Sequence, residues 1–309
     1  MKKVFIKLIQ FFTCIKYEIG FVNANELFQS GGDISDKIKW LKSNEVAESW
    51  FADPFILSVD GARIKVLVEE YFYSSNKGRI SLLDIRADSQ GYKLQRVTPV
   101  LSLDTHLSFP YIVEDGDDIY ICPENFQSGM VNLYKFDKET YKLGQPICVV
   151  NEPLVDVQII KHNDMYYLCG VKCETGAMEE TKRLKVYKSR NLCTTFDFFY
   201  ELQNSKCEER GAGKVFCAGD MIIRPAQCCE GGYGTMLIFY HMDISDNAIK
   251  EVEIGRLHPN LRSKNGLSLH TFNIVNDLCV VDGHDYKHVW RISRLIAPLI
   301  DKMLKLYRK

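Results

Sequence analysis

Ionisable side chains recur at one position of a unit that this sequence of 309 residues repeats five times. Asp53, Asp156, Arg224 and His270 lead four of the units, and residues 106–109 lead the remaining one. Two carboxyl groups can make or break a glycosidic bond. One stabilises or attacks the anomeric carbon or activates a hydroxyl group, and the other handles the proton of the leaving group. If the five positions meet in the folded chain, they predict a site that acts on a sugar.

Four carboxyl groups are the candidates for this chemistry. Asp53 and Asp156 form the predicted pair, and Glu124 or Glu70 is the predicted acid. Glu69 and Glu70 are adjacent, and because side chains alternate along a strand, we expect one of them to face the site. A single aspartate serves equally well in a turn or as a cap, so the hypothesis depends on recurrence at equivalent positions.

Three basic or aromatic side chains at the same positions are candidates for binding. Arg224 suits either a phosphate group or one of the acids, since a guanidinium donates to both. His106 and His270 suit either sugar hydroxyl groups or buried partners within the protein. Both interpretations stay open for each of them at this stage.

Five similar hairpins carry these residues. In the first, FADPFILSVDGARIKVLVEEY, Asp53 precedes a run of strand formers, a turn follows about seven positions on, and apolar residues then alternate. In the second, LSFPYIVEDGDDIYICPEN, Phe109 takes the equivalent place. The turns are expected at Asp60-Gly61, Asp115-Gly116, Asn163-Asp164, Gly231-Gly232 and Asn276-Asp277.

Further short strand-like runs between the hairpins bring the repeat to about four strands per ~50 residues, which is typical of a propeller blade. A β-sandwich also has many short strands, but it gives no reason for five similarly built hairpins. The sequence therefore predicts an all-β fold, a five-bladed β-propeller with a C-terminal amphipathic helix. In a propeller the innermost strands line a central channel, so the leading positions should converge there.

The fifth unit runs out of strand-forming sequence soon after Asp282-Gly283. Residues 17–22, YEIGFV, are a β-prone run ahead of the first unit. A strand from this run would complete the last blade and remove an exposed sheet edge. We therefore expect residues 1–286 to form the propeller and residues 287–309 to form a separate helical tail.

The tail, KHVWRISRLIAPLIDKMLKLYRK, has apolar residues on one helical face and basic residues on the other. One interpretation is a helix packed against the propeller. The other is a helix lying in the interface of an anionic membrane. The residues expected to contact such a membrane are Trp290, Arg291, Arg294, Lys302, Lys305 and Arg308.

Composition narrows the choice of partners. The formal net charge of −1 removes the general electrostatic reason to expect nucleic acid. The 11 cysteines are odd in number and lack the spacing of a zinc site, which favours a reducing, cytoplasmic setting. No calcium ligand set stands out, so we predict neither a metal nor a cofactor. The N-terminus lacks a signal-peptide cleavage pattern, and no apolar run reaches the ~20 residues that span a bilayer.

The ordered set of motifs resembles a known propeller domain. The motifs are WFADPFI, VEEY, KGRIS, HLSFPYI, IYICPE, VDVQII, RPAQ, LHTFN and VVDG, between about residues 50 and 283. They resemble the N-terminal propeller domain of plant glucosamine inositolphosphorylceramide transferases, whose relatives are typical of bacterial surface-polysaccharide clusters. That propeller in turn is similar to the five-bladed fold of arabinanases, fructosidases and related glycoside hydrolases.

The resemblance implies roles for particular residues. Asp53, in the DP motif, would be the base or nucleophile, and Asp156 would orient the substrate or stabilise the transition state. Gln227 of RPAQ and Asp282 of VVDG join His106, Arg224 and His270 as residues expected to contact the sugar. The acid glutamate of the hydrolases has only a loose counterpart, in Glu208-Glu209-Arg210-Gly211. The plant proteins also carry a separate glycosyltransferase domain, for which we find no counterpart in this sequence.

Three functions are compatible with these residues. We favour a sugar transferase of surface-polysaccharide or glycolipid biosynthesis, on the cytoplasmic face of a membrane, that takes a carbohydrate or glycolipid substrate with a nucleotide sugar as one candidate donor. The first alternative is a glycoside hydrolase for furanosides or fructosides. The second is a propeller that binds glycans without catalysis.

Overall fold

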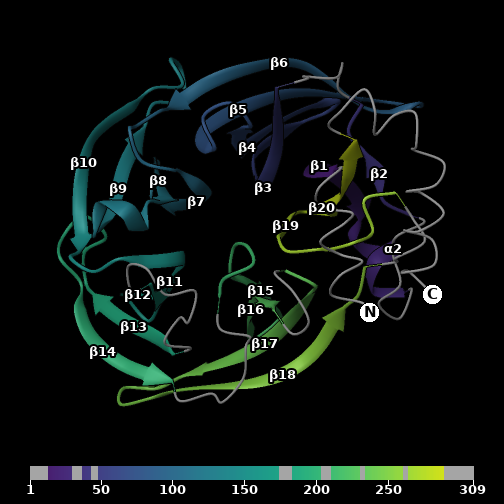
Figure 1. The fold of residues 1–309 in the computed structure, drawn as a ribbon. Helices are drawn as coiled ribbons and strands as arrows, with labels where there is room; N and C mark the ends of the chain where they lie inside the picture. Colours follow the sequence, from purple (N-terminus) through teal and green to yellow (C-terminus); the bar gives the residue numbers. More distant parts are fainter. Residues whose placement is uncertain are drawn as a thin grey trace, which may run out of the picture.

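The fold is a ring of five blades around a central axis (Figure 1). Each blade is a four-stranded antiparallel sheet, so the predicted all-β, five-bladed propeller is confirmed. The predicted C-terminal helix lies outside the described residues. The computed structural model describes residues 13–29, 37–42, 48–173, 183–202, 210–229, 234–259 and 264–288.

Four blades are built from consecutive strands, ordered from the axis outward. Blade 1 contains β3 (Ser49–Asp60), β4 (Arg63–Phe72), β5 (Lys77–Asp88) and β6 (Gly91–Leu101). Blade 2 contains β7 (Ser108–Asp115), β8 (Asp118–Glu124), β9 (Val131–Phe136) and β10 (Leu143–Val150). Blade 3 contains β11 (Leu154–His162), β12 (Met165–Lys172), β13 (Leu184–Ser189) and β14 (Asp197–Leu202). Blade 4 contains β15 (Phe216–Ala218), β16 (Met221–Cys228), β17 (Met236–Ile244) and β18 (Ile249–Leu257).

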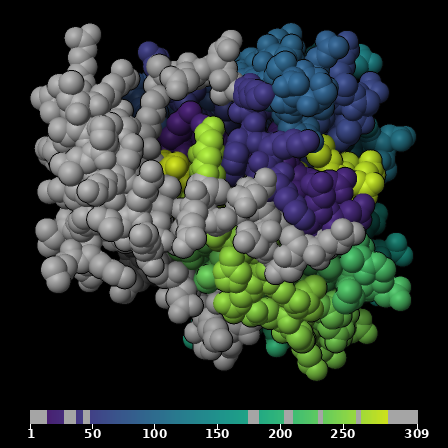
Figure 2. Space-filling model, turned by 90° about the vertical axis from the view of Figure 1, so that its right-hand side faces the viewer, coloured from purple at the N-terminus to yellow at the C-terminus, as the bar shows by residue number. Residues whose placement is uncertain are grey.

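The fifth blade joins the two ends of the described chain. Its order is β19 (Phe272–Val275), β20 (Leu278–His288), β1 (Thr13–Asn23) and β2 (Lys39–Trp40). β1 pairs with β20 along its whole length, so an N-terminal strand closes the last blade, as the β-prone run YEIGFV had led us to expect. Figure 2 shows the purple N-terminal residues beside yellow C-terminal ones on this side of the molecule. β20 continues to His288, two residues beyond the predicted end of the propeller at residue 286.

Only short helices occur in the described part of the chain. They are α2 (Ala24–Gln29), which follows β1, and the 3-10 turn η1 (Phe126–Ser128), which follows β8. None of the helices among the described residues is long and apolar enough to cross a bilayer.

The innermost strands of blades 1 to 3 share one irregularity within their first five residues. Asp53, Phe109 and Asp156 have positive φ angles of 49°, 42° and 47°. The register between first and second strands shifts at the same point in each blade. This is a β-bulge whose first residue is left-handed, a feature that re-aims backbone groups and side chains beside functional sites. Aspartate tolerates this backbone far better than phenylalanine does.

Blade 4 departs from the predicted frame. Its innermost strand is β15, which has only three residues, and Arg224 lies on the second strand, β16. The expectation that Arg224 leads an innermost strand is therefore wrong. β15 is too short to show the alternation of a strand in sequence. The sequence pattern therefore assigned the innermost position to the longer β16. The segment ahead of β15 runs beside β16, because Gln227 N–H donates to Arg210 C=O at 2.9 Å. The predicted turn at residues 231–232 lies outside the described residues.

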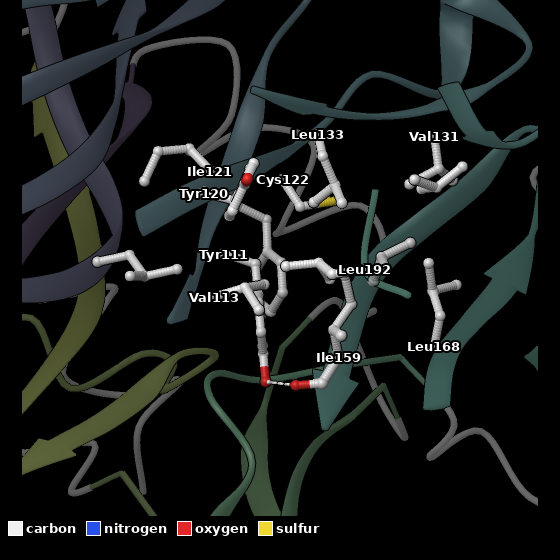
Figure 3. Close-up of a cluster of buried hydrophobic side chains, with 14 of the residues drawn as sticks. Tyr111, Val113, Tyr120, Ile121, Cys122, Val131, Leu133, Ile159, Leu168 and Leu192 are labelled. Carbon is white, nitrogen blue, oxygen red and sulfur yellow. Dashed lines mark hydrogen bonds between the residues drawn. The ribbon is translucent and has the colours of Figure 1, made fainter. Parts of the chain in front are cut away.

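The core lies between neighbouring blades and holds their inner strands in place. Figure 3 shows the cluster around Tyr111, where side chains of blades 2 and 3 interlock. The Tyr111 hydroxyl donates to Ile159 C=O at 2.7 Å and accepts from Val215 N–H at 3.2 Å, so one buried side chain links three blades. Fully buried apolar side chains surround it, which gives the channel a rigid wall. They include Ile121, Leu133 and Leu168.

Candidate functional site

Carboxyl groups connect the first residues of successive blades. The Asp282 carboxylate, from blade 5, accepts the N–H of Asp53 at 2.9 Å. Asp53 accepts the N–H of Phe109 at 3.0 Å, and Glu124 accepts the N–H of Asp156 at 3.2 Å. The three amide donors are the residues with left-handed backbone. Part of the role of these carboxyl groups is therefore to tie blade to blade. Together with the carboxyl groups of Glu69 and Asp156 we call them the acid ring: Asp53, Glu69, Glu124, Asp156 and Asp282.

One half of the acid ring lies between blades 5 and 1, and we call Asp53, His270, Thr271 and Asp282 the base group. Asp53 Oδ1 accepts from the Thr271 hydroxyl at 2.8 Å and lies 3.5 Å from His270 Nε2. His270 Nδ1 lies 2.7 Å from Asp282 Oδ1, which also accepts the N–H of Thr271 at 2.9 Å. The side chains of the group are almost completely buried. Fixed bonds thus hold the Asp53 carboxyl group in one orientation.

The base group carries charge at neutral pH. Burial alone would lower the pKa of His270, but the carboxylates of Asp282 and Asp53 outweigh it and raise this pKa to about 9. Burial raises the pKa of Asp53 to about 6, although the charge of His270 opposes the rise. At pH 7 His270 is therefore an imidazolium that is hydrogen-bonded to Asp282 and ion-paired with Asp53, and Asp53 is mostly ionised. An ionised carboxylate with a pKa this close to neutral can accept a proton.

The other half lies where blades 2, 3 and 4 meet, and we call Glu124, Asp156, Arg210 and Gln227 the acid group. Arg210 Nε donates to Asp156 Oδ2 at 2.5 Å, and Arg210 Nη2 lies 3.7 Å from Glu124 Oε2. Gln227 Nε2 donates to the same Asp156 oxygen at 3.1 Å and to Gly211 C=O at 2.8 Å. A single guanidinium therefore serves two carboxyl groups.

The guanidinium lies closer to Asp156 than to Glu124, at 2.5 Å against 3.7 Å. Burial and then the charge of Asp156 raise the pKa of Glu124 well above its usual range, and Arg210 offsets only part of the rise. These surroundings therefore favour the protonated form of Glu124, as expected for a buried carboxyl group beside a like charge. A protonated carboxyl group can donate to a leaving oxygen.

Glu69, and not Glu70, belongs to the ring. Glu69 stands opposite Ala52 on β3, and its Oε1 lies 3.4 Å from His106 Nε2. Burial and the charges of Asp53 and Glu124 raise the pKa of Glu69 well above its usual range. Glu70 instead accepts from Arg79 at 2.9 Å and from Ser81 at 2.6 Å. The prediction of a role for Glu70 in the site is wrong, because strand alternation directs its side chain to the other face of blade 1.

His106 lies beside Glu69 as a neutral side chain. Burial lowers the pKa of His106. The N–H of Gly78 donates to its Nδ1 at 2.9 Å, so the proton of the neutral ring is on Nε2, which faces Glu69. The Gly78 position has no room for a side chain, because a Cβ there would lie 2.6 Å from Glu69 Oε1. The predicted contact residue His106 thus supports a ring carboxyl group.

Arg224 takes part in a different interaction. It forms a two-point ion pair with Glu251 on β18, at 2.5 and 2.9 Å, and is 1% exposed. It also donates to Gln158 of blade 3 at 3.3 Å, so it links blades 3 and 4. Arg210 supplies the guanidinium of the acid ring. The sequence did not indicate its role, because we predicted β16 as the innermost strand of blade 4, whereas the innermost strand is β15.

One part of the ring has the donor types that a divalent metal ion takes. Asp53, His270 and Asp282 offer ligand atoms that all lie within 4.8 Å of one another. A metal on His270 would have to displace the proton that the raised pKa holds there. This arrangement therefore fits hydrogen bonding better than coordination.

Solved structures with a similar fold include enzymes that are named for the cleavage of glycosides. An exo-β-1,3-galactanase from Phanerochaete chrysosporium, solved with galactose, has a TM-score of 0.54 and 13% identity, over 71% of this chain and 56% of that one. An exo-β-1,3-galactanase from Clostridium thermocellum has a TM-score of 0.53 and 13% identity, over 67% of this chain and 50% of that one. At these identities the likeness is one of fold.

Sequence comparison indicates the family. The glucosamine inositolphosphorylceramide transferase 1 of Arabidopsis thaliana is 24% identical over 235 residues, which cover 73% of this chain and 30% of that protein. The protein of the same name from Oryza sativa subsp. japonica is 22% identical over 211 residues, which cover 67% of this chain and 28% of that protein. The aligned part of the chain thus spans less than a third of these relatives' length. Residues 39–277 match the family model described as glucosamine inositolphosphorylceramide transferase 1, N-terminal, and the chain belongs to that family.

Proposed function

We propose that the protein is a sugar transferase of surface-polysaccharide or glycolipid biosynthesis, and that the acid ring binds the glycan or the activated sugar. The observation that carries the proposal is the geometry of one buried ring that places Asp53 and Glu124 in different surroundings. These surroundings bring the pKa of Asp53 to about 6 and raise the pKa of Glu124 well above its usual range. Membership of a transferase family and a fold shared with glycoside-cleaving enzymes both support action on carbohydrate.

The proposed reaction assigns one proton transfer to each half of the ring. Glu124 donates its proton to the leaving oxygen, which takes the electrons of the breaking bond to the anomeric carbon. Asp53 accepts the proton of the acceptor hydroxyl group, whose oxygen forms the new bond. A proton then returns from Asp53 to Glu124 through solvent. Asp156 keeps the pKa of Glu124 high and faces the positive charge that develops on the sugar.

The test is transfer of sugar from activated donors to lipid or polysaccharide acceptors by the full chain. Wild-type protein should transfer sugar, and Asp53→Asn should abolish transfer. If no activated donor supports transfer, and turnover instead needs only a glycoside and water, the transferase proposal fails.

A hydrolase is the second candidate, because the same two carboxyl groups would serve if water replaced the acceptor hydroxyl group. Release of nitrophenol from nitrophenyl arabinofuranosides or galactosides, lost in Asp53→Asn, would support hydrolysis. The third candidate is a non-catalytic binding propeller. It would be supported if the protein binds sugar and if substitutions at Asp53, Glu124 and Asp156 affect no turnover.

We also propose that the basic tail places the protein on the cytoplasmic face of a membrane, beside lipid-linked substrates. The amphipathic pattern of residues 289–309 supports this proposal. Since β20 ends at His288, removal of residues 289–309 leaves the last blade intact. The truncated protein should lose binding to phosphatidylserine vesicles while its unfolding midpoint stays unchanged. Unchanged vesicle binding would contradict the proposal.

A further inference from the structure

Tyr17 is a buried aromatic residue that the proposed chemistry does not use. It lies on β1, the N-terminal strand that closes the last blade, and it is 7% exposed. In the pairing of β1 with β20, Tyr17 stands opposite His284, and Ile19 stands opposite Asp282 of the base group. The register that completes the last blade therefore also places Tyr17 close to the base group.

The Tyr17 ring contacts the imidazole of His270. The two ring centroids are 4.8 Å apart, and the ring planes are inclined by 36°. This separation and angle are those of a tilted, offset stack, because an edge-to-face pair has nearly perpendicular planes. Tyr17 also contacts Trp50 of β3 and His284 of β20, each with centroids 5.0 Å apart. Aromatic rings of two other strands thus fix Tyr17 beside His270.

His270 needs a contact of this kind because its polar partners reach it only through its two ring nitrogens. Nδ1 lies 2.7 Å from Asp282 Oδ1, and Nε2 lies 3.5 Å from Asp53 Oδ1. These contacts leave the imidazole free to tilt about the line that joins the nitrogens. A tilt would turn the N–H groups away from the carboxyl oxygens, and hydrogen bonds weaken as they lose alignment. A ring packed against the imidazole prevents the tilt.

The chemistry of Tyr17 suits this position. The face of an aromatic ring attracts a neighbouring cation, and His270 is charged at neutral pH. Burial, and then the charges of Asp282 and Asp53, raise the pKa of the Tyr17 hydroxyl group far above its usual range. The phenol therefore stays neutral, so it adds no charge to the base group.

We propose that Tyr17 is a positioning residue, whose ring holds the His270 imidazole in the orientation that binds Asp53 and Asp282. The N-terminal strand thereby completes the base group, and the site is fully formed only when β1 is paired with β20. Tyr17 acts through His270 and does not need to touch a substrate. Its effect on turnover rests on the proposed function, whereas its effect on the imidazole does not.

An NMR experiment on the full chain measures the contact. The ring protons of His270 are assigned by their loss in His270→Gln. In the wild-type protein they should show nuclear Overhauser effects to the ring protons of Tyr17. They should also resonate at high field, because the face of an aromatic ring shields nearby protons. Tyr17→Phe should keep this position, and Tyr17→Leu should move the resonances to lower field.

Tyr73→Leu is the matched control. The Tyr73 hydroxyl group donates to Ile15 C=O at 3.1 Å, so Tyr73 holds the same strand at a different residue. This variant should leave the His270 resonances where they are in the wild type. A purely structural role of Tyr17 would instead make the two leucine variants alike.

Steady-state kinetics of the proposed sugar transfer extend the test to turnover. Tyr17→Leu should lower kcat about 10- to 100-fold and leave KM nearly unchanged, because a small displacement of a reacting group is costly. Tyr17→Phe should restore kcat, and Tyr73→Leu should stay close to wild type.

Either of two NMR results would overturn the inference. One is the absence of Overhauser effects between the two rings in the wild-type protein, a measurement that needs no variant to fold. The other is that the His270 resonances of Tyr17→Leu match those of Tyr17→Phe. If the wild type turns over no sugar, the proposed function fails, and the NMR results still decide the role of Tyr17. If it does, and Tyr17→Leu has wild-type kcat, the proposed function stands and the positioning role fails.

Discussion

The two halves of the acid ring use the same kind of side chain in opposite ways. In the base group each Asp53 oxygen has fixed donors, and a complete imidazolium charge lies beside it. In the acid group two carboxyl groups divide one guanidinium, and Gln227 leaves an acceptor unpaired. Each half pairs two carboxyl groups with one cation. The difference between Asp53 and Glu124 therefore follows from the hydrogen-bond donors and from the position of the cation, since Arg210 lies 2.5 Å from Asp156 but 3.7 Å from Glu124. Environments that separate two pKa values in this way are how one site obtains both a base and an acid.

The replacement Asp53→Asn should have the largest effect. It removes the only carboxylate of the ring whose pKa of about 6 suits a base at neutral pH, and general-base removal costs about 10²- to 10⁴-fold in rate. We expect a loss of this size in kcat for sugar transfer or glycoside cleavage. Asp60→Asn, at the exposed end of the same strand, is the control and should keep full activity. Wild-type kcat in Asp53→Asn would remove Asp53 from the chemistry.

The acid group should lose stability when its guanidinium is removed. Arg210→Met leaves Glu124 and Asp156 facing each other without their shared cation, and breaking a buried ion pair costs about 3–5 kcal/mol. The matched control is Arg183→Met, which breaks the more exposed pair with Glu201 and should cost about 0–1 kcal/mol. Urea unfolding of both variants measures the difference. Equal losses would mean that the acid group is no more buried or coupled than the outer pair.

The base group should make stability fall with rising pH. The pKa of His270 is about 9 in the folded protein and about 6.5 when unfolded, so the folded state holds a proton that the unfolded state releases. The stabilisation is complete below pH 6.5 and is lost as the pH rises through 9. We expect the free energy of unfolding to fall by about 1.4 kcal/mol per pH unit in this window.

Urea unfolding at pH 6.5, 7.5 and 8.5 measures this dependence. His270→Gln should remove the His270 part of the slope, and His258→Gln, at an exposed histidine, should leave the slope as in wild type. An unchanged slope in His270→Gln would show that the imidazole is not charged in the folded protein.

The smallest effect is expected where a ring carboxyl group is already neutral. Burial and neighbouring carboxylates favour the protonated form of Glu69. Glu69→Gln puts an amide of the same shape in its place, so we expect the free energy of unfolding at pH 7 to change by less than about 0.5 kcal/mol. Glu70→Gln weakens charged hydrogen bonds to Arg79 and Ser81 and should cost about 1–2 kcal/mol. A larger loss in Glu69→Gln than in Glu70→Gln would show that Glu69 is ionised.

The sequence predicted the positions of the acid ring correctly in the blades where the repeat is regular. Asp53, Phe109 and Asp156, which lead the first three hairpins, are the three bulge residues with left-handed backbone. Each is followed by a strand and a tight turn, which are local patterns. The five-bladed fold was predictable for the same reason.

Three features of the site were beyond sequence pattern. The three residues of β15 give no strand pattern in sequence, so the strand order of blade 4 was predicted wrongly. Arg224 was therefore assigned to the site in place of Arg210. Alternation requires that Glu69 and Glu70 face opposite ways but does not say which one faces the ring. The bond from Arg210 to Asp156 joins residues 54 positions apart, and the contact depends on how the blades pack.

The most direct test of the account is the infrared spectrum of the full chain at pH 7, in the region where protonated carboxyl groups absorb. We predict a carboxylic-acid band in the wild-type protein, a loss of part of that band in Glu124→Gln, and the same band as wild type in Glu70→Gln. A spectrum without such a band, or one that Glu124→Gln leaves unchanged, would contradict the claim that the acid group holds a proton for transfer.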